Sequence, residues 1–190
     1  MRHAQIVSTG SNIPDRVVTN AEFTPRFGAS VDDWLVDHIG IRERRFRAAD
    51  QATSDLAAAA GRIALTRAGL EPAALDRIIV ATDTPDYLSP ATAAVVQAKL
   101  EARRAGVFDV NSACAGWVIA LDLAAKIILT EPEEHWVLVI GAYGMSRFLD
   151  GNDKKTATLF ADGAGAVIVG ASPAPGWLAT VTAAAGEYHD

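Results

Sequence analysis

Cys114, the only cysteine of this 190-residue chain, is the residue best placed for nucleophilic chemistry. It follows an apolar segment at 107–110, which we expect to form a buried strand, and it opens a long apolar segment at 114–130, which we expect to form a helix. Backbone N–H groups at a helix N-terminus favour a thiolate over a thiol. Four small neighbours would let a substrate carbonyl approach closely: Ser112, Ala113, Ala115 and Gly116. The alternative is an inert buried thiol, since free cysteine is among the most often buried residue types.

A nucleophilic cysteine usually works with a base and an oxyanion site. The chain holds four histidines, and none has a spacing that marks it as the partner of Cys114: His3, His38, His135 and His189. From their residue type alone, we interpret these four residues as surface or structural histidines. The sequence therefore predicts a nucleophile without a complete catalytic set.

The glycines of the segment Gly163-Ala164-Gly165 could suggest a nucleotide site. A dinucleotide fingerprint follows a strand and opens a helix, whereas we expect these glycines to form a turn that leads into a strand at 166–169. We expect them instead to allow close approach of the backbone beside a buried element. No Walker motif and no metal-binding Cys/His spacing is present, so we predict neither a nucleotide cofactor nor a metal site.

Composition excludes several classes of function. A net charge of −6 without a run of Lys or Arg argues against nucleic acid as a partner. Half of the residues are hydrophobic, which suffices for one domain with a substantial core. The segment 114–130 is too short for a comfortable membrane span and contains Asp122 and Lys126, so we interpret it as a core helix. The N-terminus lacks the apolar stretch of a signal peptide, and a single cysteine forms no internal disulfide, so we expect a cytoplasmic location.

The elements that must position Cys114 alternate between strands and helices. This alternation indicates a layered α/β fold with a largely parallel sheet. Apolar side chains lie on nearly every face of the helix at 114–130, so we expect it inside the fold, as a rigid support for the nucleophile. The charged stretch at 41–47 is expected at the surface. We expect strands at 6–10, 77–82, 107–110, 136–141, 166–169 and near Val181, and further helices at 31–39 (ending at Gly40), 53–68 (ending at Gly69) and 91–102.

Four segments, in order along almost the whole chain, resemble the signatures of the β-ketoacyl-acyl-carrier-protein synthase III family of the thiolase superfamily. They are residues 9–14 followed by 18–20, residues 33–36 followed by 40–44, residues 108–116 around Cys114, and residues 160–166. This resemblance implies a thiolase-like fold with a layered αβαβα core, of which residues 1–190 would supply the N-terminal half. An exposed apolar face is then expected where the second half would pack.

The resemblance also implies the reaction. Cys114 would take the acyl group of acyl-CoA as a thioester, and this group would condense with malonyl-acyl carrier protein or malonyl-CoA with loss of CO2. A C-terminal half, absent from this chain, would supply a His, an Asn and a glycine-rich oxyanion loop. Acyl-CoA would be a substrate and no cofactor would be needed. We further expect a homodimer.

The same resemblance assigns substrate-binding residues. Trp34 matches a tryptophan that stacks on the adenine of CoA in the family, although by residue type alone it would be a core or surface anchor. Lys154 falls where many members place an arginine that contacts CoA, and His38 where some place an arginine on the adenine. Tyr87 and Leu88 lie in a loop, 83–90, that reaches the partner subunit's acyl pocket in the family, so they would limit the length of the acyl group.

The sequence is also compatible with other functions. A related enzyme could transfer the acyl group to an oxygen or nitrogen acceptor without forming a carbon–carbon bond. A non-catalytic subunit that only pairs with an active partner would have no need of Cys114. A small-molecule-binding α/β domain is disfavoured because the chain lacks a phosphate-binding loop.

Overall fold

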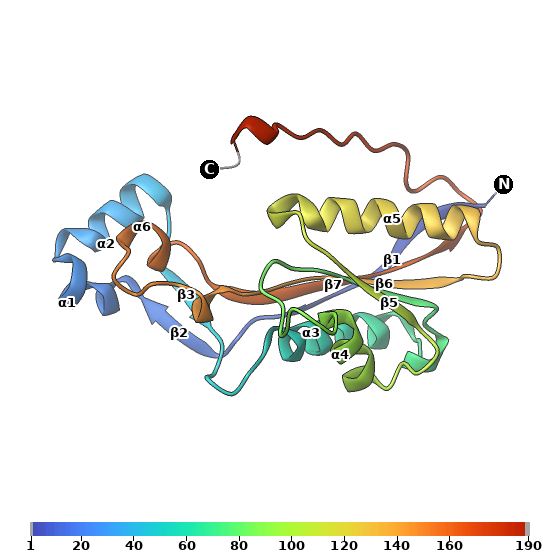
Figure 1. Ribbon diagram of the computed structural model, residues 1–190, viewed down its shortest axis with the longest axis horizontal. Coiled ribbons are helices and arrows are strands. Elements are labelled where there is room, and N and C mark those ends of the chain that lie inside the picture. Colours follow the sequence, from blue (N-terminus) through green and yellow to red (C-terminus); the bar gives the residue numbers. More distant parts are fainter. Residues whose placement is uncertain (1, 189–190) are drawn as a thin grey trace.

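The computed structural model describes residues 2–188 and consists of a main body and a smaller lobe (Figure 1). The main body is built on a five-stranded sheet with the strand order β1–β7–β6–β4–β5. Its strands are β1 (His3–Asn12), β4 (Arg77–Ala81), β5 (Gly106–Val110), β6 (Trp136–Gly144) and β7 (Asp162–Ser172). β4 is parallel to β5 and β6, whereas β7 is antiparallel to β6 and β1. The α/β fold is therefore confirmed, and the sheet is parallel except at β7.

β7 departs from the expected parallel arrangement. After β6 the chain turns back at the same end of the sheet and runs antiparallel to β6, whereas a parallel neighbour would need a crossover connection. β7 also begins earlier than expected, so Gly163 and Gly165 lie within it and the expected turn is wrong. A Cβ at Gly163 would lie 3.6 Å from the carbonyl oxygen of Asn12, and one at Gly165 would meet nothing within 4 Å. Neither glycine is required by a close backbone approach.

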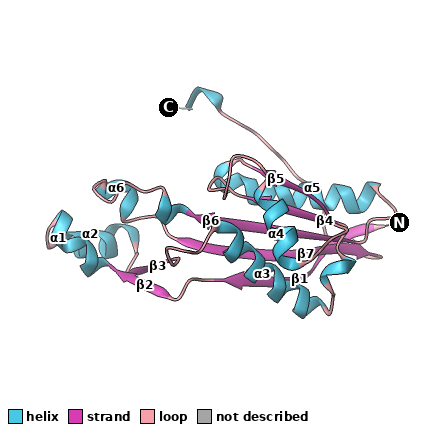
Figure 2. Ribbon diagram, turned by 60° about the horizontal axis from the view of Figure 1, so that its bottom comes forward, coloured by secondary structure: helices cyan, strands magenta, loops and turns pink. Residues whose placement is uncertain are grey.

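Helices cover both faces of the sheet (Figures 1 and 2). α3 (Thr53–Ala68) and α4 (Thr92–Leu100) pack on one face, and α5 (Gly116–Thr130) packs on the other. The sequence predicts all three helices to within two residues of these bounds. α3 ends at Gly69, which has the left-handed φ of +67° that terminates a helix.

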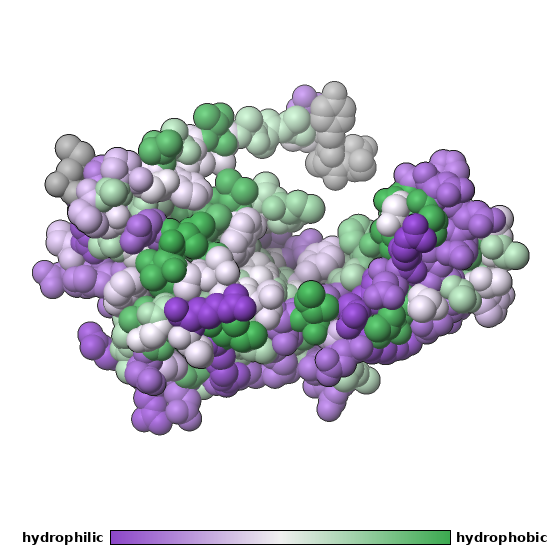
Figure 3. All heavy atoms as spheres, turned by 180° about the vertical axis from the view of Figure 1, so that it is seen from behind, coloured by the Kyte–Doolittle hydropathy of each residue, from purple (hydrophilic) through white to green (hydrophobic). Residues whose placement is uncertain are grey.

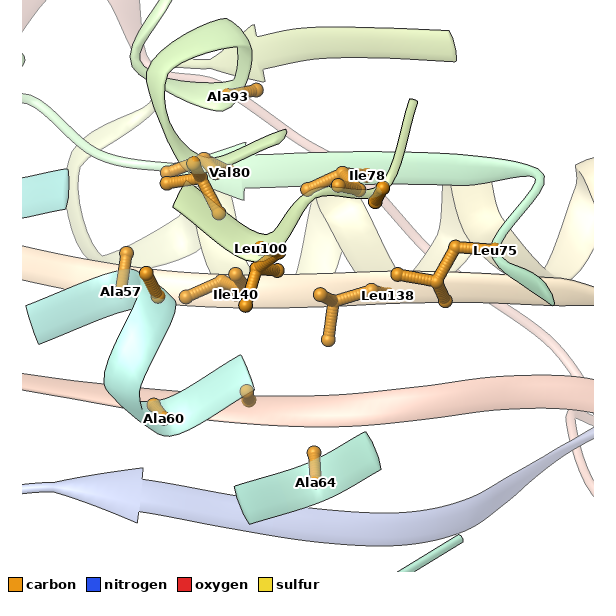
Figure 4. Packing of buried hydrophobic residues seen from close by; sticks show 14 of the residues in the cluster. Ala57, Ala60, Ala64, Leu75, Ile78, Val80, Ala93, Leu100, Leu138 and Ile140 are labelled. Carbon is orange, nitrogen blue, oxygen red and sulfur yellow. The ribbon is translucent and has the colours of Figure 1, made fainter. Parts of the chain in front are cut away.

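Small side chains let α3 lie close to the sheet (Figure 4). Ala57, Ala60 and Ala64 are fully buried on the face of α3 that meets Ile140 and its neighbours in the core. Gly10 of β1 passes so close to this helix that an added Cβ would collide with the carbonyl oxygen of Ala60. The contact between β1 and α3 is therefore a close backbone approach that tolerates no side chain at Gly10.

α5 is only partly buried, which corrects the expectation that it lies inside the fold. Ala120, Ala124 and Ile128 are fully buried against the sheet, but Val118 and Leu129 are 48% and 42% exposed on the opposite side. The reason is that a sheet covers one face of this helix only. Among residues 2–188, only the helical segment Ala113–Thr130 is long and apolar enough to cross a membrane. Core helices of globular proteins also meet this criterion of length and composition.

The smaller lobe contains the two-stranded antiparallel sheet of β2 (Arg16–Thr19) and β3 (Glu43–Phe46), together with short helices. These are α1 (Thr24–Phe27), α2 (Ser30–Trp34) with a following π-helical turn (Leu35–Ile39), and α6 (Lys154–Ala157). The helix expected at 31–39 is thus confirmed, and it ends at Gly40 with a φ of +82°. Further 3₁₀ turns occur at Asn20–Phe23, Pro72–Ala74, Ala113–Ala115, Met145–Arg147 and Gly186–Tyr188.

Arg44 lies inside the lobe and corrects the expectation that the stretch 41–47 is a surface segment. It is 5% exposed and donates to the side chain of Asn20 and the carbonyl of Thr158, each at 2.8 Å. Its guanidinium lies 4.8 Å from the ring of Phe23. Burial lowers the pKa of Arg44, while the charge of Glu22 acts in the opposite direction. The alternation of β3 directs this side chain inward, which a count of charges cannot reveal.

The C-terminal segment follows an irregular path beside α5 (Figure 1) and does not form the strand expected near Val181. Its contacts with the main body include two hydrogen bonds: the backbone N–H of Trp177 donates to the carbonyl of Ala4 at 2.9 Å, and the hydroxyl of Thr180 donates to Asp122 at 2.7 Å. Val181 is exposed. A strand needs a neighbouring strand for its hydrogen bonds, and among residues 2–188 no strand of either sheet pairs with a strand near Val181.

Candidate active site

Cys114 lies in the turn that joins β5 to α5. The 3₁₀ turn Ala113–Ala115 runs directly into the first residue of α5, Gly116. Ala113 has a φ of +44°, a conformation that costs a non-glycine residue of the order of 1–3 kcal/mol. This sharp turn leaves the thiol of Cys114 exposed, so the interpretation of an inert buried thiol is wrong.

A carboxylate fixes the strand that leads to this turn. Asp109 of β5 accepts hydrogen bonds from the backbone N–H groups of Thr92 and Ala93 at 2.6 and 2.8 Å. These groups belong to the N-terminus of α4, where a negative charge is stabilising. The bonds tie the end of β5 to a helix on the far face of the sheet, which helps to hold Cys114 in place.

A cavity of about 610 Å³ opens beside Cys114. Three of its walls follow from the topology: β4, β5 and β6 are parallel, so their carboxyl ends meet at one edge of the sheet, which is where ligands of α/β proteins commonly bind. In Figure 3 the surface is hollowed between the main body and the smaller lobe. The other lining residues come from the carboxyl ends of two strands and from the turn with Cys114. They are residues 81–83 at the end of β4, residues 141–143 at the end of β6 with the nearby Met145, then Ala113, Trp117 of α5, and Phe160.

Two ionisable side chains share this cavity with the thiol. Tyr143 has a raised pKa, first because of burial and then because of its electrostatic interactions with Asp83 and Cys114. Its ring also contacts Phe160, with 6.1 Å between the centroids. A phenol with a raised pKa stays neutral at physiological pH and can both donate and accept a hydrogen bond. The cavity is therefore a mostly apolar space with one carboxylate and one neutral phenol beside the Cys114 side chain.

Sequence reasoning predicted only Cys114 as a site residue of this cavity and missed the others, Asp83, Tyr143, Met145 and Phe160 among them. They come from segments that follow different strands, so no local motif connects them. The rule that the carboxyl ends of parallel strands meet at one edge could have found Asp83 and Tyr143, because both follow or end strands that the sequence predicts at 77–82 and 136–141.

None of the histidines among the described residues lines the cavity. His38 belongs to the smaller lobe, and His3 and His135 lie at the amino ends of β1 and β6, away from the edge that holds Cys114. His189 lies outside the described residues. A histidine partner for Cys114 is therefore not among the described residues that line this cavity. The same residues contain no group of three His, Cys, Asp or Glu side chains that could hold a metal ion.

The structure brings Trp34, His38 and Lys154 together on the smaller lobe. The rings of Trp34 and His38, one helical turn apart, stack with centroids 6.4 Å apart, and Nδ1 of His38 lies 3.2 Å from the carbonyl oxygen of Trp34. Lys154 of α6 places its Nζ 4.9 Å from the Trp34 ring centroid. An aromatic ring beside a cation suits an aromatic ligand with phosphate groups. A contact of these residues with CoA stays a prediction.

Tyr87 and Leu88 are exposed at the tip of the loop between β4 and α4 and do not line the cavity of their own chain. The base of this loop is fixed, because the hydroxyl of Thr53 donates to the carbonyl of Thr84 at 2.7 Å and the N–H of Ser54 donates to Asp86 at 3.0 Å. A rigid base with an exposed apolar tip suits contact with a second molecule. Their role in limiting the acyl group is untested.

The strand order, the helices on both faces and the cysteine at a strand–helix turn define a thiolase-like α/β fold. Residues 108–186 match the 3-oxoacyl-[acyl-carrier-protein (ACP)] synthase III family. The whole chain is 44% identical to the β-ketoacyl-[acyl-carrier-protein] synthase III of Laribacter hongkongensis, of which it covers 59%. The chain is therefore similar in sequence to proteins of the β-ketoacyl-acyl-carrier-protein synthase III family.

Solved structures show the same relationship. The chain matches the 3-oxoacyl-[acyl-carrier-protein] synthase III of Aquifex aeolicus with a TM-score of 0.84 and 39% identity, over 90% of this chain and 55% of that one. It matches the priming β-ketosynthase of the R1128 polyketide biosynthetic pathway with a TM-score of 0.86 and 34% identity, over 92% and 52% of the two chains. The chain thus spans a little more than half the length of these relatives.

Proposed function

We propose that this chain carries the acyl-accepting part of a β-ketoacyl synthase III active site. The observation that supports this most directly is the exposed thiol of Cys114 at the mouth of a cavity of about 610 Å³. In the proposed step, Sγ of Cys114 attacks the thioester carbonyl of acyl-CoA and forms a new thioester. The bond between this carbonyl and the sulfur of CoA breaks, and the proton of the Cys114 thiol leaves with CoA.

In this proposal Trp34, His38 and Lys154 bind CoA. The stacked pair of Trp34 and His38 would hold the adenine, and the ammonium of Lys154 would face a phosphate. The cluster of Trp34, His38 and Lys154 lies on the lobe that borders the hollow in Figure 3. A long, flexible ligand such as CoA could extend from this cluster to the cavity beside Cys114. Acyl-CoA serves as a substrate, and the mechanism requires no cofactor.

The second step of the proposal is condensation of the bound acyl group with a malonyl thioester on acyl carrier protein or CoA. Loss of CO2 generates a carbanion that attacks the acyl carbonyl on Cys114 and forms the new carbon–carbon bond; the bond from this carbonyl to Sγ breaks, and the released thiolate takes up a proton from water. The His and Asn for this step would come from a C-terminal half, either as a continuation of the chain or as a partner. Exposed apolar residues on the outer side of α5, Val118 and Leu129 among them, support such a partner.

We also propose a cytoplasmic homodimer in which the exposed tip of the loop with Tyr87 and Leu88 enters the acyl pocket of the second copy. The support is the exposure of both side chains above a hydrogen-bonded base. Such a contact would bury apolar surface that otherwise faces water.

Intact-protein mass spectrometry after incubation with acetyl-CoA tests the first step. We expect one acetyl adduct that hydroxylamine removes, as it does a thioester, and complete loss of this adduct in Cys114→Ala. Lys126→Ala, which changes an exposed nucleophile on the same helix, should keep the adduct. An adduct that persists in Cys114→Ala would contradict the proposal.

Addition of malonyl-acyl carrier protein tests the second step. The adduct should persist in this chain alone and disappear when a C-terminal half is supplied, with a β-ketoacyl product. Release of an ester or amide instead would indicate a transferase to an oxygen or nitrogen acceptor.

A further inference from the structure

We propose that the cavity beside Cys114 selects acyl groups that carry a hydrogen-bond donor, a hydroxyl or an amino group, and that Asp83 and Tyr143 bind this substituent. The inference rests on the proposed function, because it assumes that Cys114 takes an acyl group. It adds the chemical class of that acyl group.

The first argument is that Asp83 and Tyr143 have no polar partner. Within the described part of the chain, neither side chain makes a hydrogen bond or an ion pair, although both line the cavity. The third polar side chain of the lining, Thr82, is already used, since its Oγ1 accepts from the N–H of Thr84 at 3.1 Å. The polar side chains of the cavity that have no partner within the described protein are therefore one half-buried carboxylate and one half-buried phenol.

The second argument concerns what an acyl group does to these two groups. The remaining walls are apolar or small, with Trp117, Met145 and Phe160 as the largest side chains. An acyl chain that fills the space displaces water from Asp83 and Tyr143. A plain hydrocarbon chain would leave both groups without partners, which is costly for a carboxylate above all. A hydroxyl or ammonium on the acyl chain would replace the lost water.

The third argument is that the two groups are chemically complementary to such a substituent. The carboxylate of Asp83 only accepts hydrogen bonds, whereas the phenol of Tyr143 both donates and accepts. A hydroxyl can donate to Asp83 and accept from Tyr143, and an ammonium can donate to both. A carboxylate substituent would meet the negative charge of Asp83 and is disfavoured.

Matched four-carbon CoA thioesters test this inference. The rate of Cys114 acylation is followed by intact-protein mass spectrometry with butyryl-CoA, 3-hydroxybutyryl-CoA, 3-aminobutyryl-CoA and succinyl-CoA. Because a site with unpaired hydrogen-bonding groups rejects an analogue that lacks the partner, we expect the hydroxyl or the amino substrate to react at least about tenfold faster than butyryl-CoA. Succinyl-CoA should react slowest. The faster of the two donor substrates identifies the substituent.

Variants then connect the preference to the two residues. Asp83→Ala should bring the ratio of the favoured substrate to butyryl-CoA close to one, and Tyr143→Phe should lower it in part. Asp83→Asn keeps the shape and removes the charge, so a preference for the amino substrate should collapse while one for the hydroxyl substrate persists in part. Asp50→Asn, which changes an exposed carboxylate outside the cavity, should leave every ratio unchanged. Thermal melting by circular dichroism checks that each variant folds.

The outcomes separate this inference from the proposed function. An adduct that forms as fast from butyryl-CoA as from both donor substrates would overturn the inference and leave the proposed function standing. The same holds if Asp83→Ala and Asp83→Asn, correctly folded, keep the wild-type ratio. If none of the four thioesters modifies Cys114, both proposals fail.

Discussion

The main body and the smaller lobe position their candidate functional residues by different physical means. Cys114 is attached to a sheet and a helix whose buried apolar side chains form two large clusters, one on each face of the sheet. Trp34, His38 and Lys154 belong to short helices around a much smaller cluster and one buried arginine. The proposed reacting atom is thus held by a large core, whereas the proposed ligand surface is assembled from side chains on short elements.

A glycine-to-alanine change in the main body should give the largest effect on stability. Gly10→Ala brings a Cβ against the backbone of α3 at Ala60, and backbone atoms cannot move aside as a flexible side chain can. We expect a loss of about 3 kcal/mol in the free energy of unfolding, measured by urea denaturation. Gly165→Ala is the control, because an added Cβ there meets nothing within 4 Å. Equal stability of the two variants would mean that the contact of β1 with α3 is not tight.

Loss of the buried arginine should disturb the smaller lobe by a lesser amount. Arg44→Ala leaves the oxygens of Asn20 and Thr158 without their donor and empties the space over the Phe23 ring. We expect a destabilisation of about 2 kcal/mol by urea denaturation. Arg45→Ala, the neighbouring position with an exposed ion pair to Glu43, should change stability by less than about 0.5 kcal/mol. A larger effect of Arg45→Ala would contradict the assignment of Arg44 as the internal residue.

Removal of the stacked ring on the lobe should weaken substrate binding and leave the chemistry on the main body intact. Trp34→Ala should raise the acyl-CoA concentration for half-maximal acylation of Cys114 about tenfold, equivalent to about 1.4 kcal/mol, with little change in the maximal rate. Lys154→Gln should act in the same direction without removing apolar surface from the lobe. His135→Ala is the control, at the opposite edge of the sheet. A fall in the maximal rate alone would place Trp34 outside the binding site.

The smallest effect should come from the hydrogen bonds that hold the C-terminal segment to α5. The hydrogen bond from Lys126, followed by that from Thr180, lowers the pKa of Asp122. A lowered pKa in the folded state stabilises the protein above the unfolded pKa of about 3.9, and this contribution is lost as the pH falls through the folded value. Asp122→Asn should therefore be less stable than wild type at neutral pH, and the difference should shrink below about pH 4. Thermal melting across this range measures it, and a difference independent of pH would contradict the assignment.

The sequence predicted the helices of the main body well because their apolar patterns and terminators are local. α3 begins at Thr53 and ends before Gly69 as expected, and α5 was indicated by its apolar run. The direction of β7 was not predictable in this way, because it depends on whether the chain returns at the same edge of the sheet. The inward direction of Arg44 and the absence of a strand near Val181 likewise depend on which neighbours are present in space.

For the candidate site, the sequence alone identifies the candidate nucleophile. Cys114 lies between a strand and a helix, with small neighbours, and each of these signals is contained in about ten consecutive residues. The surroundings of Cys114 depend on the folded arrangement of the strands. Asp83, Tyr143 and Phe160 are separated in sequence by tens of residues, and they meet because β4, β5 and β6 end at one edge of the sheet. Local patterns encode helices and strands, whereas a cavity is formed by elements that meet only when the sheet is assembled.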